Sequence, residues 1–304
     1  MTAAVNRISI LALGLIGGSL AKAIKANGFT GEIVAWGRTE KNLQRGVELG
    51  VVDRYSLDLA DAIAGADVIV IATPTLITAD VLQQLALLRK ADVLGDEVII
   101  TDVASVKGSV LAAAVEAFGE VPVNLVLGHP IAGSEKSGVE AAKADLYVNH
   151  RVILTPVATT NPAAVAVVKR LWQLAGAEVV EMDVFEHDEV LAATSHLPHI
   201  LAYALVDMLA TSSEQQNIFR FAAGGFRDFT RIASSDPTMW HDISLANNEA
   251  LLKMIDSFSG QLSTLRSAIE NKDSESIMAS FTRAKSARDQ FAQMLEKQSK
   301  DSSE

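Results

Sequence analysis

The 304-residue sequence contains no cysteine, no long uninterrupted apolar run and comparatively few basic residues. Without cysteine the chain has no disulfide, no thiolate nucleophile and no thiolate metal ligand, which fits a reducing cytoplasm. No apolar run approaches the roughly 18 residues that indicate a membrane-spanning helix, so no membrane segment is predicted. Lys and Arg number 26 against 37 Asp and Glu, and the net charge of −11 argues against nucleic acid as a partner. An anionic ligand would therefore depend on a few well-placed cations.

Hydrophobic residues make up 49% of the chain, and in its first half they alternate between short strand-like runs and helical stretches. Near-continuous apolar strands separated by helices are typical of a parallel sheet covered on both faces. A further helix and strand within residues 163–183 are expected to extend the same sheet. The predicted strands are residues 7–13, 32–36, 67–73, 97–103, 123–128 and 151–156.

From about residue 184 the strand pattern stops and long helical stretches follow. The sequence therefore predicts an α/β fold in which a Rossmann-type, doubly wound sheet domain (1–183) precedes an all-helical domain (184–304). The helical stretches 199–210 and 243–262 carry more apolar surface than a small isolated bundle would cover. We expect this half to form a homodimer.

The segment "ILALGLIGGSL" (10–20) resembles a phosphate-binding turn between a strand and a helix, with Ala12 at the position of the usual first glycine. Gly14 would let the backbone approach a pyrophosphate, and Gly17 would let the helix pack tightly on the strand. Alanine fits the first position if its φ angle stays negative. The alternative is a tight packing turn without a ligand. Leu15 and Ile16, inside the turn, are also assigned to cofactor binding.

The end of the second predicted strand indicates which dinucleotide binds. An acidic residue there would hold the ribose 2′-hydroxyl of NAD, but "IVAWGRTEKN" has Gly37 and Arg38 instead. A guanidinium suits the 2′-phosphate of NADP, and Thr39 offers a hydroxyl donor. We therefore predict NADP, with NAD possible because Glu40 lies close. The alternative is that Arg38 is an ordinary surface residue. Thr73, which ends the strand 67–73, completes the predicted cofactor contacts.

Two polar clusters follow predicted strands, where ligands bind in open α/β sheets. In "GHPIAGSEKSG" (128–138), His129 is placed to accept a hydroxyl proton as hydride leaves the same carbon. In "TDVASVKGSV" (101–110), Ser105 is a second candidate, and the alternative is that it caps the next helix. A lone histidine after a strand is more often structural.

The segment "SHLPH" (195–199) places His196 and His199 three residues apart on a predicted helix, which Pro198 is expected to kink toward the cleft. Such a pair can ligate a metal, but no convincing third ligand accompanies it and no metal is predicted. The other interpretations are substrate contact and plain helix packing. His150, His187 and His241 are assigned mostly to structure.

Five segments together resemble the prephenate/arogenate dehydrogenases of tyrosine biosynthesis, in order over residues 7–285. They are "LGLIGGSL", "TDVASVKG", "GHPIAGSEKSGVEAA", "HDEVLAATSHLPHILAYAL" and "GGFRDFTRIASSDPTMW". The resemblance implies oxidative decarboxylation of a cyclohexadienol: hydride leaves C4 for the nicotinamide, the C4 hydroxyl loses its proton, and the ring carboxylate departs as CO2. The sequence departs from NAD-using members at Gly37-Arg38, which favours NADP, and it carries Ala12 for a glycine.

The resemblance also implies a role for each matching residue. His129 would accept the proton of the 4-hydroxyl, Ser105 would orient that hydroxyl or the imidazole, and Arg231 would grip the ring carboxylate. His199 and His196 would face the substrate. Glu135 would be a gating carboxylate at the pocket mouth, and Trp240 an aromatic that reaches the site from the partner subunit.

Two other functions remain open at this level. A β-hydroxyacid or pyrroline-carboxylate type of dehydrogenase shares the plan of a Rossmann domain followed by helices. Such an enzyme is expected to place a lysine on a helix of the C-terminal domain or to lack the GHPIAG cluster, which this sequence has. A redox sensor that binds NADP without turnover would not need His129, Ser105 and Arg231 together. The sequence leaves open the choice between prephenate and arogenate.

Overall fold

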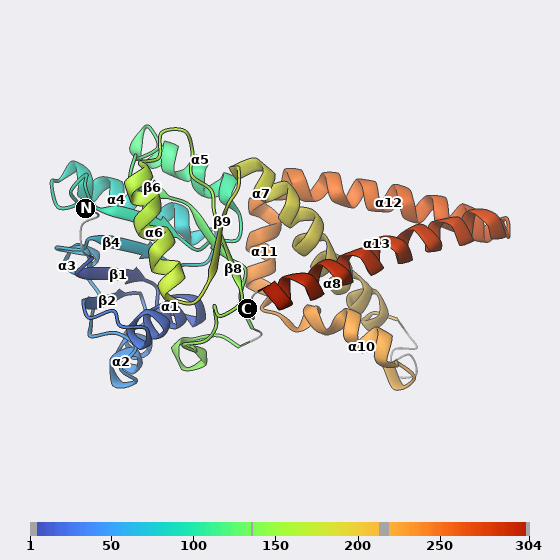
Figure 1. Ribbon diagram of the computed structural model, residues 1–304, viewed down its shortest axis with the longest axis horizontal. Coiled ribbons are helices and arrows are strands. Elements are labelled where there is room, and N and C mark those ends of the chain that lie inside the picture. Colours follow the sequence, from blue (N-terminus) through green and yellow to red (C-terminus); the bar gives the residue numbers. More distant parts are fainter. Residues whose placement is uncertain (1–4, 135, 213–218, 302–304) are drawn as a thin grey trace. The chain divides into compact units, whose positions relative to one another are not determined.

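The computed structural model describes residues 5–134, 136–212 and 219–301 of the chain (Figure 1). The chain divides into two compact units, Met1–Leu251 and Leu252–Glu304. All the described candidate site residues lie in the first unit.

A six-stranded parallel sheet forms the centre of the first unit, with strand order β3-β2-β1-β4-β5-β6. The order reverses between β1 and β4, and in open α/β sheets ligands bind beyond the carboxyl ends of the strands at such a point. The strands are β1 (Arg7–Leu11), β2 (Glu32–Trp36), β3 (Arg54–Ser56), β4 (Val68–Ile71), β5 (Ile99–Asp102) and β6 (Leu125–Val126).

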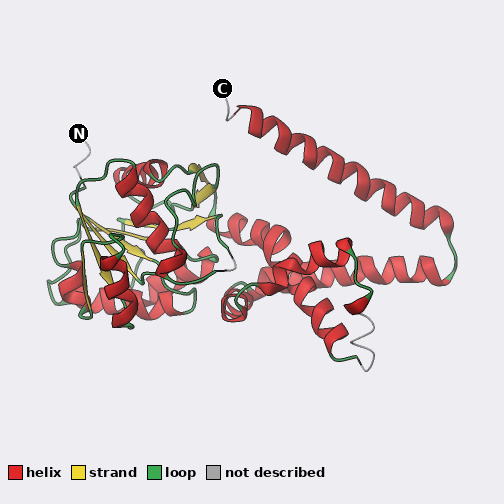
Figure 2. Cartoon of the chain, turned by 90° about the horizontal axis from the view of Figure 1, so that it is seen from below, coloured by secondary structure: helices red, strands yellow, loops and turns green. Residues whose placement is uncertain are grey.

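Helices cover both faces of this sheet, as Figures 1 and 2 show. Successive side chains of a strand point to opposite faces of the sheet, so alternate residues pack in two separate hydrophobic cores. Ile10 and Val70 pack in one core with Leu20, whereas Ile69 and Ile71 pack in the other with Leu85. The predicted Rossmann-type fold class is confirmed. The helices are α1 (Leu15–Ala26), α2 (Glu40–Glu48), α3 (Leu59–Ile63), α4 (Ile77–Lys90), α5 (Lys107–Phe118) and α6 (Pro162–Leu174).

A second sheet of three strands is present, so the prediction of a single sheet is wrong in part. The chain leaves the main sheet after Val126 and forms β7 (Gly128–Pro130), which runs antiparallel to β8 (Arg151–Leu154); β9 (Glu178–Glu181) runs parallel to β8. The segments 151–156 and 178–183 therefore do not extend the main sheet. The main sheet ends here because two buried side chains hydrogen-bond to the backbone of Gly128. Asp102 accepts a hydrogen bond from the Gly128 N–H, and Lys107 donates one to the Gly128 carbonyl.

The helical part of the first unit begins after β9. A π-helical turn, η2 (Ala192–His196), interrupts the long helix. Pro198, which lacks a backbone N–H, is the second residue after this turn. The remaining elements are η1 (Val139–Ala141), α7 (Val184–Leu191), α8 (Leu197–Ala210), α10 (Gly224–Thr230), η3 (Arg231–Ser234) and α11 (Pro237–Ala246).

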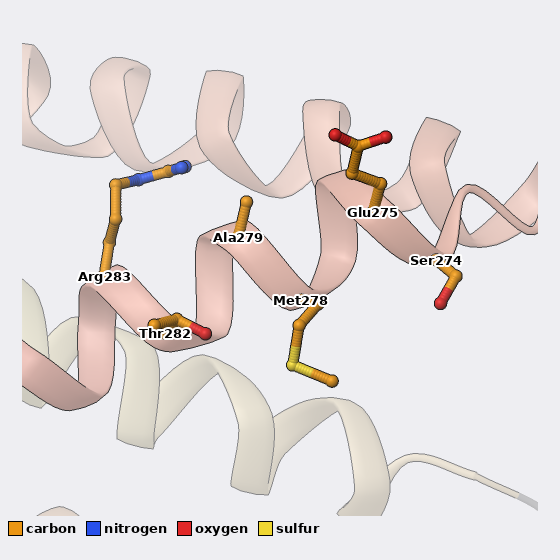
Figure 3. A pocket seen from close by; sticks show the side chains of 6 residues that line it. All are labelled: Ser274, Glu275, Met278, Ala279, Thr282 and Arg283. Atoms are coloured by element: carbon orange, nitrogen blue, oxygen red, sulfur yellow. The ribbon is translucent and has the colours of Figure 1, made fainter.

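The second unit consists mainly of two long helices, α12 (Asn248–Glu270) and α13 (Ser274–Asp301), whose arms diverge in Figure 2. Among the described residues, no helix is long and apolar enough to cross a membrane. A shallow depression lies on α13 between Ser274 and Arg283 (Figure 3). The large apolar side chains exposed on these two helices are Leu252, Phe258, Leu262, Ile269, Met278, Phe281, Phe291, Met294 and Leu295.

Candidate active site

The turn after β1 has the geometry of a phosphate-binding turn. A Cβ atom on Gly14 would meet nothing within 4 Å, so its backbone faces open space that a pyrophosphate can approach closely. A Cβ atom on Gly17 would lie 2.8 Å from both the Ala12 carbonyl oxygen and Ile10 Cγ2, so only glycine fits between strand and helix. Helix α1 begins at Leu15, directly after Gly14, and the first N–H groups of a helix have no intrahelical partner and favour phosphate. The residues present therefore fit a dinucleotide.

The prediction that the φ angle of Ala12 stays negative is wrong. The angle is +78°, in the left-handed region that non-glycine residues rarely adopt. The Ala12 N–H donates to the Trp36 carbonyl at 2.8 Å, a contact that continues the β1–β2 pairing into the turn. The chain thus keeps the conformation of the usual glycine and carries a strain of about 1–2 kcal/mol.

The other predicted cofactor residues also lie at the carboxyl ends of the central strands. Gly37 directly follows β2, and Arg38 and Thr39 are exposed beyond it. Arg38 has no ion pair with any described residue, whereas the nearby Glu40 carboxylate accepts a hydrogen bond from Tyr55. Leu15 and Ile16 open α1, and Thr73 follows β4 with its hydroxyl 3.1 Å from that of Thr78. All of them follow the carboxyl ends of β1, β2 or β4.

His129 lies in β7 and is 9% exposed. Its Nδ1 atom is 2.9 Å from Nε2 of His187, and Nδ1 of His187 is 2.8 Å from the Asp188 carboxylate. The Nε2 atom of His129 has no hydrogen-bond partner among the described residues. Burial lowers the pKa of His129 well below its usual value of 6.5, and the neighbouring His187, Lys107 and His196 lower it further. The imidazole is therefore neutral at physiological pH.

A buried ion pair fixes the backbone at His129. Lys107 and Asp102 are both fully buried and in contact, and Lys107 Nζ also donates to the Gly128 carbonyl at 2.6 Å. Burial lowers the pKa of Lys107, and the Asp102 carboxylate opposes that shift. Removing either partner would leave an unpaired buried charge, at a cost of about 3–5 kcal/mol. Asp102 at the end of β5 and Lys107 at the start of α5 thus hold β7 in position.

Ser105 is not the cap of α5, so that alternative is wrong. The cap position belongs to Val106, and its side chain makes no capping bond. The Asp188 carboxylate instead accepts the first free backbone N–H groups of the helix, from Lys107 and Gly108, each at 2.8 Å. Ser105 is half-buried, and its hydroxyl has no hydrogen-bond partner among the described residues. The hydroxyl is therefore free to bind a ligand.

His196 is 1% exposed and has a defined protonation state. Asn247 Nδ2 donates one hydrogen to the Asp188 backbone carbonyl at 2.9 Å and the other to His196 Nδ1 at 3.1 Å. His196 Nδ1 must therefore be an unprotonated acceptor, with the proton on Nε2. Burial and the neighbouring histidines lower the pKa of His196 to about 4, against the opposing effect of Asp188.

His199 and Trp240 form a stacked pair, with ring centroids 3.6 Å apart and planes at 19°. Trp240 is 7% exposed, and its Nε1–H has no partner within the described structure. Trp240 packs on His199 of its own chain, and its approach to the site of a partner subunit stays a prediction. Arg231 begins η3, is exposed, and has no ion pair with the residues described. Burial lowers the pKa of His199, and the charge of nearby Arg231 adds to this effect.

Glu135 lies outside the described residues. Within the described ranges no group of three or more His, Asp or Glu side chains is placed to hold a metal ion. The ring nitrogens of His196 and His199 instead bond to Asn247 and to the Ser195 carbonyl.

Sequence reasoning missed three residues of this cluster, His187, Asp188 and Asn247. The adjacent pair "HD" at the start of a helix was the available signal for the first two, because a carboxylate beside a histidine can orient its ring. Nothing in the sequence pattern distinguished Asn247, since its partners lie 51 and 59 residues away.

Fold and site together define a dinucleotide-dependent oxidoreductase. Residues 20–181 match the family model described as prephenate dehydrogenase, nucleotide-binding domain, and residues 183–283 match prephenate dehydrogenase, dimerization domain. The chain belongs to the prephenate dehydrogenase family. It is a dehydrogenase that binds a nicotinamide dinucleotide.

Similar proteins match along nearly the whole chain. A cyclohexadienyl dehydrogenase of Zymomonas mobilis is 37% identical over 286 residues, which cover 93% of this chain and 95% of that protein. The crystal structure of a prephenate dehydrogenase from Aquifex aeolicus, in complex with hydroxyphenyl propionate and NAD+, is 34% identical with a TM-score of 0.86 and covers 95% of this chain and 99% of that one. A Synechocystis arogenate dehydrogenase is 27% identical with a TM-score of 0.78, covering 94% and 99%.

Proposed function

We propose that this enzyme catalyses the NADP-preferring oxidative decarboxylation of prephenate or arogenate in tyrosine biosynthesis. The products would be 4-hydroxyphenylpyruvate or tyrosine, and CO2. The observation that carries the proposal is the geometry of His129: its imidazole lies at the carboxyl end of the sheet, is held through Nδ1, and has no partner for Nε2 among the described residues. Burial, which lowers the pKa of His129, supports the same role. The names of the similar proteins support this substrate class.

His129 acts as the proton acceptor in this proposal. The bound nicotinamide supplies the acceptor for the hydride that leaves C4 of the substrate. As that bond breaks, the 4-hydroxyl becomes acidic and its proton passes to Nε2 of His129. The bond from the ring to its carboxylate then breaks and CO2 leaves. The electron pair of that bond completes the aromatic ring, and the phenolate oxygen formed at C4 takes the proton back from His129. The hydroxyl of Ser105, which has no partner among the described residues, orients the 4-hydroxyl or the imidazole.

Arg231 binds the ring carboxylate. The guanidinium has no ion pair with a described residue, and its charge is near enough to His199 to lower the pKa of that side chain. A forked, charge-assisted contact matches a carboxylate. The same region is lined by His199, His196 and Trp240. The buried Nε1–H of Trp240, which has no partner within the described ranges, offers a further donor. Glu135 is proposed as the carboxylate at the pocket mouth.

The preference for NADP follows from the end of β2. Arg38 is exposed and has no ion pair within the described structure, and Glu40 bonds to Tyr55. A cation without a partner and an acid that is already engaged both favour a 2′-phosphate over a 2′-hydroxyl. The proposed cofactor site also includes Ala12, Gly14, Leu15, Ile16, Gly17, Gly37, Thr39 and Thr73.

We also propose that the chain is a homodimer and that its helical domain begins at residue 184. The apolar side chains exposed on α12 and α13 support the dimer, because helices that leave so many apolar groups in water gain from a partner. Sedimentation at micromolar concentration should give twice the monomer mass of 32.3 kDa. A single species of monomer mass would contradict the dimer.

The direct experiment measures kcat/KM for prephenate and for arogenate, each with NADP+ and with NAD+, together with CO2 release. We expect turnover of at least one substrate, with higher kcat/KM for NADP+. Arg231→Ala should mainly raise KM, because an unpaired substrate carboxylate costs about 2–5 kcal/mol. The exposed Arg227, four residues earlier, pairs with Asp228 and provides the matched control Arg227→Ala. No turnover of either substrate would overturn the proposed function.

A further inference from the structure

Three side chains from distant parts of the sequence form one hydrogen-bonded row. His129 comes from β7, and His187 and Asp188 come from α7, which lies 58 residues later in the chain. The contacts run from His129 Nδ1 to His187 Nε2 at 2.9 Å and from His187 Nδ1 to Asp188 Oδ1 at 2.8 Å. His187 is fully buried, so water does not compete for these contacts.

The positions of the protons in this row follow from the carboxylate. Burial would raise the pKa of Asp188, but hydrogen bonds from His187, Lys107 and Gly108 outweigh that effect and hold it below its usual value. An ionised carboxylate only accepts, so a singly protonated His187 carries its proton on Nδ1 and presents a lone pair at Nε2. His129 must then donate from its own Nδ1, which leaves the lone pair on its Nε2.

The opposite arrangement is unfavourable at both contacts. If His129 carried its proton on Nε2, its Nδ1 lone pair would face Nε2 of His187. For a singly protonated His187, relieving that repulsion would place its proton on Nε2, and its bare Nδ1 would then face the Asp188 carboxylate. Burial makes either pair of facing acceptors costly, at about 1–3 kcal/mol for each unmade bond.

We propose that His187 and Asp188 are positioning residues that hold His129 in the tautomer whose Nε2 accepts the substrate proton. This inference rests on the proposed function. Asp188 also stabilises the positive charge that forms on His129 once the proton has been transferred. The same carboxylate caps α5 through the Lys107 and Gly108 N–H groups, so the start of that helix fixes its orientation.

Two amide variants separate the roles of the two His187 nitrogens. The side chain in His187→Gln reaches the position of Nε2 and still offers an acceptor to His129. The shorter side chain in His187→Asn keeps a donor near Asp188 but offers nothing to His129. We expect His187→Asn to lower kcat by about 10- to 100-fold with little change in KM, by analogy with partners that orient metal-bound histidines. His187→Gln should recover most of this loss.

Nitrogen-15 NMR of the histidine-labelled protein reads the tautomer directly. In the unmutated protein at pH 7.5, the His129 signals, assigned by their absence from His129→Asn, should show a protonated Nδ1 and an unprotonated Nε2. His187→Asn should show a mixture of tautomers. Thermal unfolding and NADPH affinity of both variants check that the fold and the cofactor site are intact.

The outcomes distinguish this inference from the proposed function. Wild-type kcat in His187→Asn, or a protonated Nε2 on His129 in the unmutated protein, would overturn the positioning role even if His129→Asn is inactive. Full activity of His129→Asn would instead overturn the proposed function itself. The spectrum of the unmutated protein decides the point even if neither His187 variant folds.

Discussion

The choice of cofactor depends on two adjacent residues that can be changed without disturbing the fold. Arg38 is exposed and forms no ion pair with the residues described, so Arg38→Ala removes a charge and leaves no partner unsatisfied. A Cβ atom on Gly37 would approach only the Leu43 side chain, at 3.4 Å, so Gly37→Asp adds a carboxylate with little steric cost. A charge-assisted contact is worth about 1.5–3 kcal/mol. Arg38→Ala should therefore weaken NADP binding by roughly ten- to a hundredfold.

Fluorescence titration with NADPH and NADH, at one fixed ionic strength, measures both affinities. NADH should bind Arg38→Ala as well as it binds the unmutated protein, and should bind Gly37→Asp more tightly. Lys41→Ala, which removes a neighbouring exposed cation, is the matched control and should change NADPH affinity far less. Equal affinities for NADPH and NADH in the unmutated protein would refute the assigned role of Arg38, as would a Kd in Arg38→Ala within twofold of the unmutated value.

Two further predictions concern stability. Ala12→Gly should raise the free energy of unfolding by up to about 1 kcal/mol in urea titrations, because glycine adopts the positive φ angle without strain. The control Ala112→Gly in α5 should lower the free energy of unfolding by a similar amount. Equal losses of stability in both variants would contradict the strain at Ala12. The pKa of His196 falls from 6.5 to about 4 on folding, so the unfolded chain binds more protons than the folded protein between these pH values. His196 should therefore lower the free energy of unfolding by about 2 kcal/mol at pH 5 relative to pH 8. His196→Asn should show a correspondingly smaller pH dependence, and an identical dependence would show that His196 is not the titrating group.

The main sheet was predictable because its strands are short apolar runs buried on both faces, such as "VIVI" in β4. β3 was missed because "RYS" is only half-buried and has no apolar pattern. The second sheet could not be predicted from the sequence. It forms because the buried side chains of Asp102 and Lys107 hydrogen-bond to the Gly128 backbone, which ends the pairing with the main sheet. Those contacts depend on tertiary structure and leave no periodic signal.

The site was predictable where a motif carried it. His129 and Ser105 follow strands, and the glycine turn has its strand and helix in the expected places. The φ angle of Ala12 was not predictable, since the bond to the Trp36 carbonyl sets it from the neighbouring strand. The row that joins His129 to His187 and Asp188 was also hidden, because only the fold brings β7 against α7.

The kinetics of His129→Asn test the central claim most directly. The charge that His129 accepts develops only as the hydride leaves, so the residue should matter in the transition state and little in substrate binding. Steady-state measurement at saturating NADP+ should show kcat lower by about 10²–10⁴-fold and KM nearly unchanged. A variant with wild-type kcat and a raised KM would show that His129 binds substrate and does not accept the proton.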